Sequence, residues 1–287
     1  MTVLPPGLDH LKDTERGVAW LRALPGVVER CASGWGLHLG APYDYAYASL
    51  AVRCTTARGD ACVLKIQFPD RESEREADAL ARWDGDGAVR LLAHDPDVGA
   101  LLLERCVPGT PLSAADPDVA LDVAVGLLPR LWKRAGDPFR PLTEEAQWWL
   151  QGLARTWERA GRPFERTLLD EALEVLRTLP YSQGEQVLVN QDLHADNVLR
   201  AQREPWLLID PKPLAAEREF GVVALVRGGE LGHSRQAVHH RLNRLADELG
   251  LNRDRVRLWT LAHAIAWGFE GDQVLEPFIE VARWLRR

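Results

Sequence analysis

The chain contains 287 residues, 46% of them hydrophobic, and carries a formal net charge of -7 at pH 7. This length suffices for one large domain or for two lobes that share a cleft. No stretch approaches the roughly 18 uninterrupted apolar residues of a membrane span, and the acidic balance argues against a phosphate-backbone binder, which normally has a basic face. The N-terminal segment lacks the apolar centre of a secretory signal, so we expect a cytoplasmic protein with no membrane or nucleic-acid partner.

The four cysteines, Cys31, Cys54, Cys62 and Cys106, lie far apart in the sequence and form no C-x-x-C pair. Cys54 and Cys62 fall in segments with the composition of strands. This spacing favours four buried or inert thiols over a zinc site or a set of disulfides.

The first part of the chain predicts a helix followed by a hairpin. Residues 8–32 carry apolar positions at helical spacing. "SLAVRCTT" (49–56) and "ACVLKIQF" (61–68) are rich in apolar and β-branched residues and flank a plausible tight turn. Two such runs around a turn are typical of a β-hairpin.

A second helix and a further strand follow the hairpin. "ESEREADALARW" (72–83) places Glu76, Leu80 and Trp83 on one face of a helix. "ALLLERC" (100–106) predicts another strand, and the segment after it predicts a connection. We therefore expect a small lobe over residues 1–106 that is mostly sheet, with an N-terminal helix and one key internal helix.

Residues 107–287 predict a larger and mainly helical lobe, with apolar residues three and four apart in several long segments. Two short apolar runs, "QVLVN" (186–190) and "PWLLID" (205–210), interrupt the helices and predict a hairpin. Helices resume near residue 235, and we expect Trp259, Trp267 and Trp284 in the core. No repeat or low-complexity linker separates the two parts, so we interpret them as two lobes of one α+β unit.

A cluster of polar residues, "NQDLHADN" (190–197), directly follows the first of these runs. Asp192 and Asn197 stand in this loop, and Asp210 ends the next apolar run. Carboxylate and amide oxygens suit Mg²⁺, which also binds substrate phosphates, so Asn197 and Asp210 are candidate metal ligands. Asp192 is then available to accept a proton from an attacking hydroxyl, as in kinase-type phosphoryl transfer.

These segments resemble a known family. "NQDLHADNVL" followed by "LLIDPKP" is similar to the H-G-D-x-H-x-x-N and I-D-x-x segments of aminoglycoside phosphotransferases, antibiotic kinases with the protein-kinase fold. "REPWLLIDPKPLAAEREF" most resembles the streptomycin 6-kinase branch, which is grouped with hydroxyurea phosphotransferases. Together with "VLKIQF", "EREADALARWDGDGAVRLLAHD" and "GALLLERCVPGTPL", the motifs cover most of residues 35–225 in family order.

For the catalytic loop, the resemblance implies that Asp192 is the catalytic base and that Asn197 and Asp210 bind the magnesium ions. His194 matches the structural histidine of the family's loop.

For the nucleotide, the resemblance implies ATP as the phosphate donor. Lys65 matches the lysine that holds the α- and β-phosphates, and Glu76 matches the helix glutamate that orients this lysine. A lysine in an apolar strand is costly unless an anion meets it, which agrees with these roles. The backbone from Glu104 to Cys106 matches the connection that offers hydrogen bonds to adenine.

The chain departs from the family pattern at three places. Asn190 and Gln191 stand where relatives carry His-Gly before the catalytic aspartate. "APYDYAYASL" (41–50) replaces a phosphate-covering turn of small residues, and Gly221 replaces the aspartate of an E-F-D segment.

The resemblance implies an ATP- and magnesium-dependent kinase that phosphorylates a hydroxyl of a small molecule, with an aminoglycoside such as streptomycin as the first candidate. The acidic balance suits a cationic acceptor. An amino sugar such as glucosamine, or hydroxyurea, is the alternative acceptor, and a kinase-like module that binds ligand with weak or no turnover is the alternative class. Monomer and dimer both remain open.

Several other charged residues have two interpretations. Lys212 is either a phosphate or substrate contact or a solvated loop lysine. Four acidic residues are either contacts for a cationic acceptor or plain surface charges, namely Glu217, Glu219, Glu270 and Asp272.

Overall fold

The structure, a computed structural model, describes residues 4–44 and 47–286. Two compact units make up the chain: Met1–Gly109 with Ala201–Leu207, and Thr110–Arg200 with Leu208–Arg287. One short segment of the chain therefore returns from the second unit to the first. Within the unusual loop 41–50, Tyr45 and Ala46 lie outside the described residues.

The first unit is built on a five-stranded antiparallel sheet with the strand order β1-β2-β3-β5-β4. The predicted hairpin is confirmed, because β2 and β3 pair from Ser49↔Gln67 to Thr55↔Ala61. The elements of this unit are η1 (Pro6–Asp13), α1 (Glu15–Trp35), β1 (Leu37–Pro42), β2 (Ser49–Thr56), β3 (Ala61–Gln67), α2 (Glu76–Trp83), β4 (Leu91–Asp95) and β5 (Ala100–Glu104).

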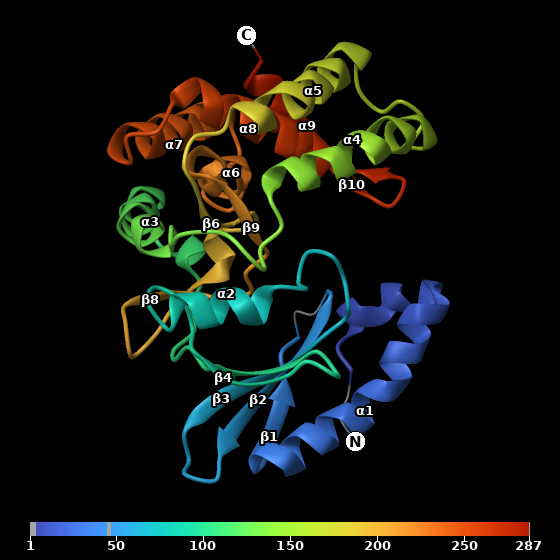
Figure 1. Ribbon diagram of the computed structural model, residues 1–287, viewed down its shortest axis with the longest axis vertical. Helices are drawn as coiled ribbons and strands as arrows, with labels where there is room; N and C mark the ends of the chain where they lie inside the picture. The colour runs from blue at the N-terminus through green and yellow to red at the C-terminus, as the bar shows by residue number, and fades with distance from the viewer. Residues whose placement is uncertain (1–3, 45–46, 287) are drawn as a thin grey trace. The chain divides into compact units, whose positions relative to one another are not determined.

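The two faces of this sheet have different roles. Leu64 and Ile66 of β3 belong to a hydrophobic core that includes Leu24 and Val28 of α1. Because side chains alternate across a strand, Lys65 projects from the opposite face. Figure 1 shows α1 and α2 on different sides of the sheet. The alternation of β3 thus delivers one lysine to the side of the sheet that α2 covers.

Helix α2 begins at Glu76, later in the chain than the predicted start at residue 72. The Asp70 carboxylate accepts hydrogen bonds from the backbone N–H groups of Glu72 (2.8 Å) and Ser73 (2.7 Å). An aspartate that binds the backbone two and three residues ahead stabilises a turn in competition with a helix. Glu76 therefore becomes the first helical residue, next to the sheet.

The second unit is mainly helical, as predicted. Its elements up to the polar loop are η2 (Leu112–Ala114), α3 (Pro117–Leu131), α4 (Leu142–Arg159), α5 (Arg166–Thr178), η3 (Leu179–Ser182) and β6 (Gln186–Asn190). The later elements are η4 (Ala195–Asn197), β7 (Val198–Arg200), β8 (Trp206–Leu208), β9 (Pro213–Glu217), η5 (Arg218–Val222), α6 (Val223–Arg227), α7 (Arg235–Glu248), α8 (Arg253–Ala266), β10 (Phe269–Glu270), β11 (Gln273–Val274) and α9 (Glu276–Trp284).

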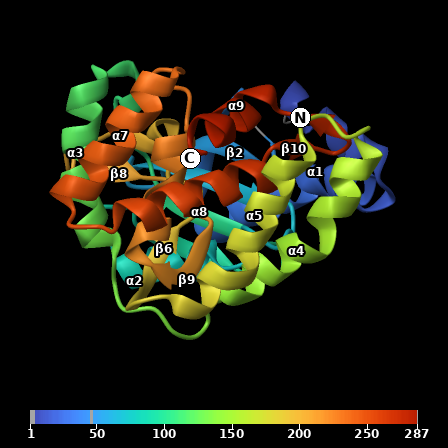
Figure 2. The same cartoon turned by 90° about the horizontal axis from the view of Figure 1, so that it is seen from above.

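The helices of the second unit pack around a core of aromatic rings. Helix α5 packs against both α4 and α8, as the two views in Figures 1 and 2 show. The ring of Phe220 packs edge-on against Trp259 at 5.3 Å and against His263 at 5.5 Å, and Trp149 contacts both Phe220 and His263. The predicted core position of Trp259 is confirmed, whereas Trp267 and Trp284 are only partly buried.

The predicted hairpin between residues 186–190 and 205–210 is wrong, because β6 pairs with β9 instead. The pairing is antiparallel and runs from Gln186↔Glu217 to Asn190↔Pro213. All the residues of β9 are buried, so it offers β6 an apolar partner that the sequence pattern did not distinguish from a loop.

Gly221 makes room for a neighbouring indole ring. An added Cβ at this position would lie 2.8 Å from Nε1 of Trp132 and 3.2 Å from Cγ1 of Val189. Real Cβ atoms essentially never approach other atoms as closely as the first of these distances. The space that a side chain at residue 221 would need is therefore occupied by Trp132 and Val189.

Among the residues that the structure describes, no helix combines the length and apolar character needed to cross a membrane.

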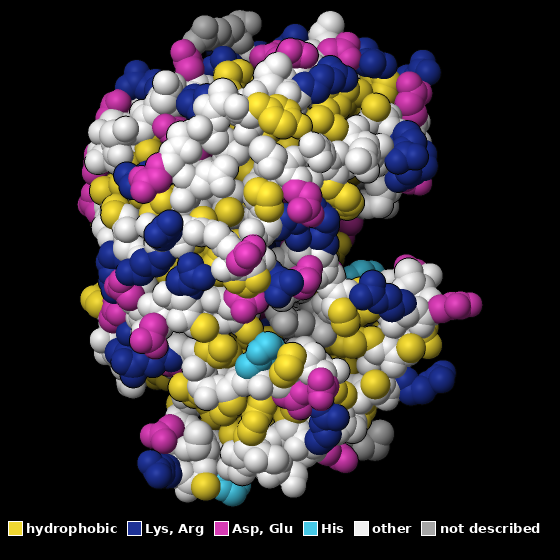
Figure 3. All heavy atoms as spheres, viewed as in Figure 1, with side chains coloured by type: hydrophobic (Ala, Val, Ile, Leu, Met, Phe, Trp, Pro, Cys, Tyr) yellow, Lys and Arg dark blue, Asp and Glu magenta, His cyan; other side chains and the backbone are white. Residues whose placement is uncertain are grey.

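On the face seen in Figure 3, Lys and Arg side chains are interspersed with Asp and Glu side chains, and no continuous basic area is visible there.

We predict that Gly221→Ala lowers the free energy of unfolding by about 1–3 kcal/mol, because the added methyl group overpacks the site beside Trp132. Urea denaturation measures this change. The matched control is Gly126→Ala in α3, where nothing lies within 4 Å of the added Cβ and alanine favours the helix. Equal stability of the Gly221→Ala and wild-type proteins would contradict the packing argument.

Candidate active site

The polar loop after β6 is organised by the buried side chain of Asn190. Its Oδ1 accepts hydrogen bonds from the backbone N–H of Asp192 (3.0 Å) and from that of Lys212 (2.8 Å). The backbone N–H of Gln191 donates to the carbonyl of Lys212 at 3.0 Å. Asn190 therefore joins the segment that carries Asp192 to the segment that follows Asp210.

The two candidate metal ligands are also brought together by the backbone. The N–H of Ile209, next to Asp210, donates to the carbonyl of Asn197 at 2.8 Å. The side-chain amide of Asn197 donates to the carbonyl of Asp192 at 3.0 Å, which fixes the orientation of the amide group. Asp210 has a φ of 50°, a left-handed conformation that is uncommon outside glycine and is associated with functional sites.

This donor set fits Mg²⁺. Among residues 4–44 and 47–286, no three His, Cys, Asp or Glu side chains form a metal-binding group. Magnesium does not need such a group, since it is usually bound by one or two protein oxygens together with waters and substrate phosphates. The amide oxygen of Asn197 and the carboxylate of Asp210 supply oxygens of the required kind.

Two cations flank the carboxylate of Asp192. Nζ of Lys212 lies 3.3 Å from Oδ2, and Nη2 of Arg227 lies 3.7 Å from Oδ1. Both cations also lie over the ring of Trp267, at 4.7 Å for Lys212 and 5.1 Å for Arg227, and Arg227 lies 4.1 Å from the ring centre of Phe278. The sequence left Lys212 open between a substrate or phosphate contact and a solvated loop lysine, and it gave no indication of Arg227.

Burial changes the protonation behaviour of two groups beneath this site. Burial lowers the pKa of Arg227 to about 10, which still leaves it charged at neutral pH. His263 stacks on Trp267 at 4.7 Å, and neither of its ring nitrogens has a hydrogen-bond partner among the described residues. Burial, with the nearby charges of Arg227 and Lys212, holds the pKa of His263 well below its usual range.

Glu230 supports the polar loop from the segment after α6. Its Oε1 accepts a hydrogen bond from the backbone N–H of Ala195 at 2.8 Å and lies 3.9 Å from Nδ1 of His194. An added Cβ at Gly228 would lie 2.5 Å from both carboxylate oxygens of Glu230, so glycine leaves space for this group. The sequence alone gave no signal for Glu230, which is 35 residues from Ala195.

In the first unit, Lys65 and Glu76 form a buried ion pair. Nζ of Lys65 lies 2.6 Å from Oε2 of Glu76, and the side chains are 8% and 0% exposed. Nε2 of Gln67 donates to the same carboxylate oxygen at 2.7 Å. The geometry agrees with the lysine and glutamate pairing that the sequence predicted, and their contact with nucleotide stays a prediction.

The predicted connection around Glu104 and Cys106 is secured by a residue that the sequence analysis missed. Arg203 donates from Nε to Oε1 of Glu104 at 2.9 Å and from Nη2 to Oε2 at 2.9 Å. It also donates to the carbonyls of Gly85 and Ala88, at 2.7 and 2.9 Å.

Cys106 is buried, and its burial raises the thiol pKa to about 12. The backbone N–H of Glu104 already donates to Arg90, so any adenine contact by Glu104 would use its carbonyl.

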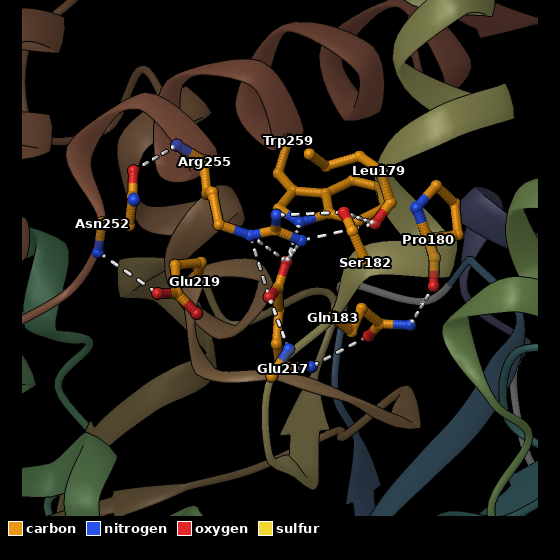
Figure 4. A network of polar contacts seen from close by, with 10 residues as sticks. Leu179, Pro180, Ser182, Gln183, Glu217, Glu219, Asn252, Arg255 and Trp259 are labelled. Carbon is orange, nitrogen blue, oxygen red and sulfur yellow. Dashed lines mark hydrogen bonds and ion pairs between the residues drawn. The ribbon is translucent and has the colours of Figure 1, made fainter.

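Glu217 is a buried structural residue and not a surface charge. Figure 4 shows its carboxylate facing Arg255 and Trp259. Arg255 donates to it from Nη2 at 2.7 Å, and the indole N–H of Trp259 donates at 2.5 Å. Arg255 also reaches the carbonyl of Leu179 and the hydroxyl of Ser182. With its carboxylate occupied in this way, Glu217 is not a contact for a cationic acceptor.

The other acidic candidates lie elsewhere on the second unit. Glu219 accepts a hydrogen bond from the backbone N–H of Asn252 at 3.2 Å. Asp272 pairs with Arg159 at 2.9 Å, and both side chains are largely exposed. Glu270 is exposed in β10. An exposed pair such as Asp272–Arg159 is typical of a solvated surface.

Comparison with known proteins identifies the family. The sequence profile described as aminoglycoside/hydroxyurea antibiotic resistance kinase matches residues 39–271. The chain belongs to this family. It is 38% identical to a hydroxyurea phosphotransferase of Kitasatospora aureofaciens over 93% of the chain and 79% of that relative. It is 37% identical to a streptomycin 6-kinase of Streptomyces griseus over 88% of the chain and 84% of that relative.

Solved structures confirm the protein-kinase-like fold of this family member. The choline kinase LicA from Streptococcus pneumoniae superposes with a TM-score of 0.66 at 13% identity, over 91% of this chain and 98% of that one. An aminoglycoside phosphotransferase in complex with AMP-PNP and hygromycin B superposes with a TM-score of 0.58 at 14% identity, over 90% of this chain and 94% of that one. At such identities the likeness establishes the fold alone.

We predict that Glu76→Ala lowers the free energy of unfolding of this kinase-family protein by about 3–5 kcal/mol, because it removes the carboxylate that pairs with the buried Lys65 ammonium. The double replacement Lys65→Met with Glu76→Leu removes both charges and should be less destabilising than Glu76→Ala. Urea denaturation of the three proteins measures the difference. A double variant that is less stable than Glu76→Ala would contradict this account.

We also predict a pH effect from His263. Its folded-state pKa lies below the unfolded value of about 6.5, so the unfolded state binds more protons as the pH falls, and the free energy of unfolding decreases below about pH 6.5. His263→Leu should remove up to about 1.4 kcal/mol of this decrease per pH unit. Denaturation at pH 7 and at pH 5 measures it, with His38→Leu at an exposed position as the control. An unchanged pH dependence in His263→Leu would contradict the prediction.

Proposed function

We propose that this protein is an ATP-dependent kinase that transfers the γ-phosphoryl group to a hydroxyl of an aminoglycoside such as streptomycin. The observation that carries the proposal is the joining of the Asp192 and Asp210 segments through Asn190 and Asn197, in a chain of the antibiotic kinase family. The similarity to streptomycin 6-kinases supports the acceptor class. Because ATP is supplied in the cytoplasm, we place the activity there.

In the proposed reaction, Asp192 accepts the proton of the acceptor hydroxyl as its oxygen bonds to the γ-phosphorus. The bond between the γ-phosphorus and the bridging oxygen breaks, and ADP leaves with the electron pair. Asn197 and Asp210 would hold Mg²⁺, which screens the phosphate charge when bound. Lys65, held by Glu76, would bind the α- and β-phosphates, and the backbone of Glu104 and Cys106 would bind adenine.

Hydroxyurea is the second candidate acceptor, because the chain is 38% identical to a hydroxyurea phosphotransferase over most of its length. The two candidates differ in chemistry: hydroxyurea is small and neutral, whereas streptomycin is large and cationic. A parallel assay with both compounds and with glucosamine therefore decides the acceptor. Binding of Mg-ATP without transfer to any acceptor would instead support a module that only binds nucleotide. The binding of Mg-ATP is measured as an increase in the melting temperature of the folded protein.

We predict that Asp192→Asn lowers the rate of transfer by about 100- to 10,000-fold, because the variant loses the proton acceptor. The stabilisation of the protein by Mg-ATP should remain, since the substitution preserves the shape of the side chain. Mass spectrometry of the acceptor after incubation with Mg-ATP detects the added phosphate.

The matched control for this experiment is Asp196→Asn, an exposed aspartate in the same loop that binds the hydroxyl of Ser113. This control should transfer phosphate at close to the wild-type rate. A full rate in Asp192→Asn would mean that the base is assigned to the wrong residue.

A further inference from the structure

Two hydrogen bonds hold the backbone of Lys212 in its loop. Its N–H donates to the side chain of Asn190 at 2.8 Å, and its carbonyl accepts from Gln191 at 3.0 Å. Both partners directly precede Asp192 in the chain. The backbone from which the Lys212 side chain extends is therefore held in place next to the loop that carries the proposed base.

The ammonium group of Lys212 lies between a carboxylate and an aromatic face. Nζ is 3.3 Å from Oδ2 of Asp192 and 4.7 Å from the ring centre of Trp267. The side chains of Lys212 and Asp192 are 24% and 15% exposed, so the pair is shielded more than a surface salt bridge but remains accessible. A cation over a tryptophan ring is stabilised by the ring quadrupole. The ring thus limits the positions that the ammonium can occupy.

The choice of residue is informative, since the chain uses lysine rarely. Of its 35 lysines and arginines, only Lys12, Lys65, Lys133 and Lys212 are lysines. Lys65 is paired with the buried Glu76, and Lys212 is paired with Asp192. A compact ammonium with rotatable donors can approach one carboxylate oxygen from above a ring, whereas the planar guanidinium favours two-point contacts.

We propose that Lys212 is a positioning residue for phosphoryl transfer: its ammonium, held by Trp267, keeps the Asp192 carboxylate in the orientation that receives the proton of the acceptor. Arg227, at 3.7 Å from the other carboxylate oxygen, limits rotation of the carboxylate from the second side. The inference rests on the transfer reaction proposed above and adds no new chemical step. It gives Lys212 a role that differs from both of the interpretations that the sequence left open.

The test uses Lys212→Cys, followed by alkylation with 2-bromoethylamine, which restores an ammonium group at nearly the original length. The four native cysteines are buried, and burial raises the thiol pKa of Cys54 and Cys106 to about 12, so they react poorly. We expect Lys212→Cys to lower kcat about 100-fold, as for other small misplacements of reacting groups. The KM values for Mg-ATP and acceptor should stay close to wild type, and alkylation should restore most of the lost kcat.

The matched control is Lys12→Cys, treated in the same way. Lys12 forms an exposed pair with Asp9, far from the loop in sequence, and this variant should keep the wild-type kcat before and after alkylation. An unchanged kcat in Lys212→Cys would overturn the inference, and so would a loss that alkylation does not restore. A rise in KM with an unchanged kcat would instead assign Lys212 to substrate binding and would also overturn it.

Trp267→Leu provides a second, independent test should Lys212→Cys fail to fold. It removes the ring beneath the ammonium and leaves both charged side chains in place. We therefore expect kcat to fall with little change in KM. An unchanged kcat would overturn the inference.

The wild-type protein separates this inference from the proposed function. If wild type transfers no phosphate, the proposed function fails; if it does and Lys212→Cys matches it, only the role of Lys212 fails.

Discussion

The antiparallel pairing of β6 with β9 is the constraint on which the candidate site depends. It sets Asn190 opposite Pro213, and the register continues into the loops through the hydrogen bond between Gln191 and Lys212. A shift of one residue would turn every side chain of the strand to the other face. The buried amide of Asn190 makes this register specific, because its oxygen receives two backbone N–H groups, one from each loop. Asp192 and the segment after Asp210 are held together as a result.

Charge compensation in partly or fully buried surroundings recurs in both units. The first unit buries Lys65 against Glu76, and the second buries Glu217 against Arg255 and Trp259. Buried pairs of this kind add little net stability compared with apolar residues, but the loss of one partner is strongly destabilising. They therefore act to keep particular side chains in place. The pair of Asp192 with Lys212 is more exposed than these, which leaves its carboxylate accessible for the proposed transfer.

The sequence predicted much of the fold because local patterns were strong. The β2–β3 hairpin follows from two apolar runs around a turn, and the long helices follow from apolar periodicity. The partner of β6 was predicted wrongly, since β9, "PLAAE", has the composition of neither a typical strand nor a turn. Its assignment as a strand depends on burial, which no local pattern reports. Helix α2 begins later in the chain than predicted for a local reason, because Asp70 forms a turn with the backbone that precedes the helix.

By itself, the sequence determined the family, and it predicted the base, the metal ligands and the lysine–glutamate pair, because these residues lie in motifs of fixed spacing. The tertiary structure alone decided which other residues surround them. Arg227, Glu230 and Arg203 come from segments far away in the chain, and their contacts depend on how helices and loops pack. It also showed that Glu217 is structural and that Lys212 meets Asp192, since the sequence does not show which charged side chains lie close together.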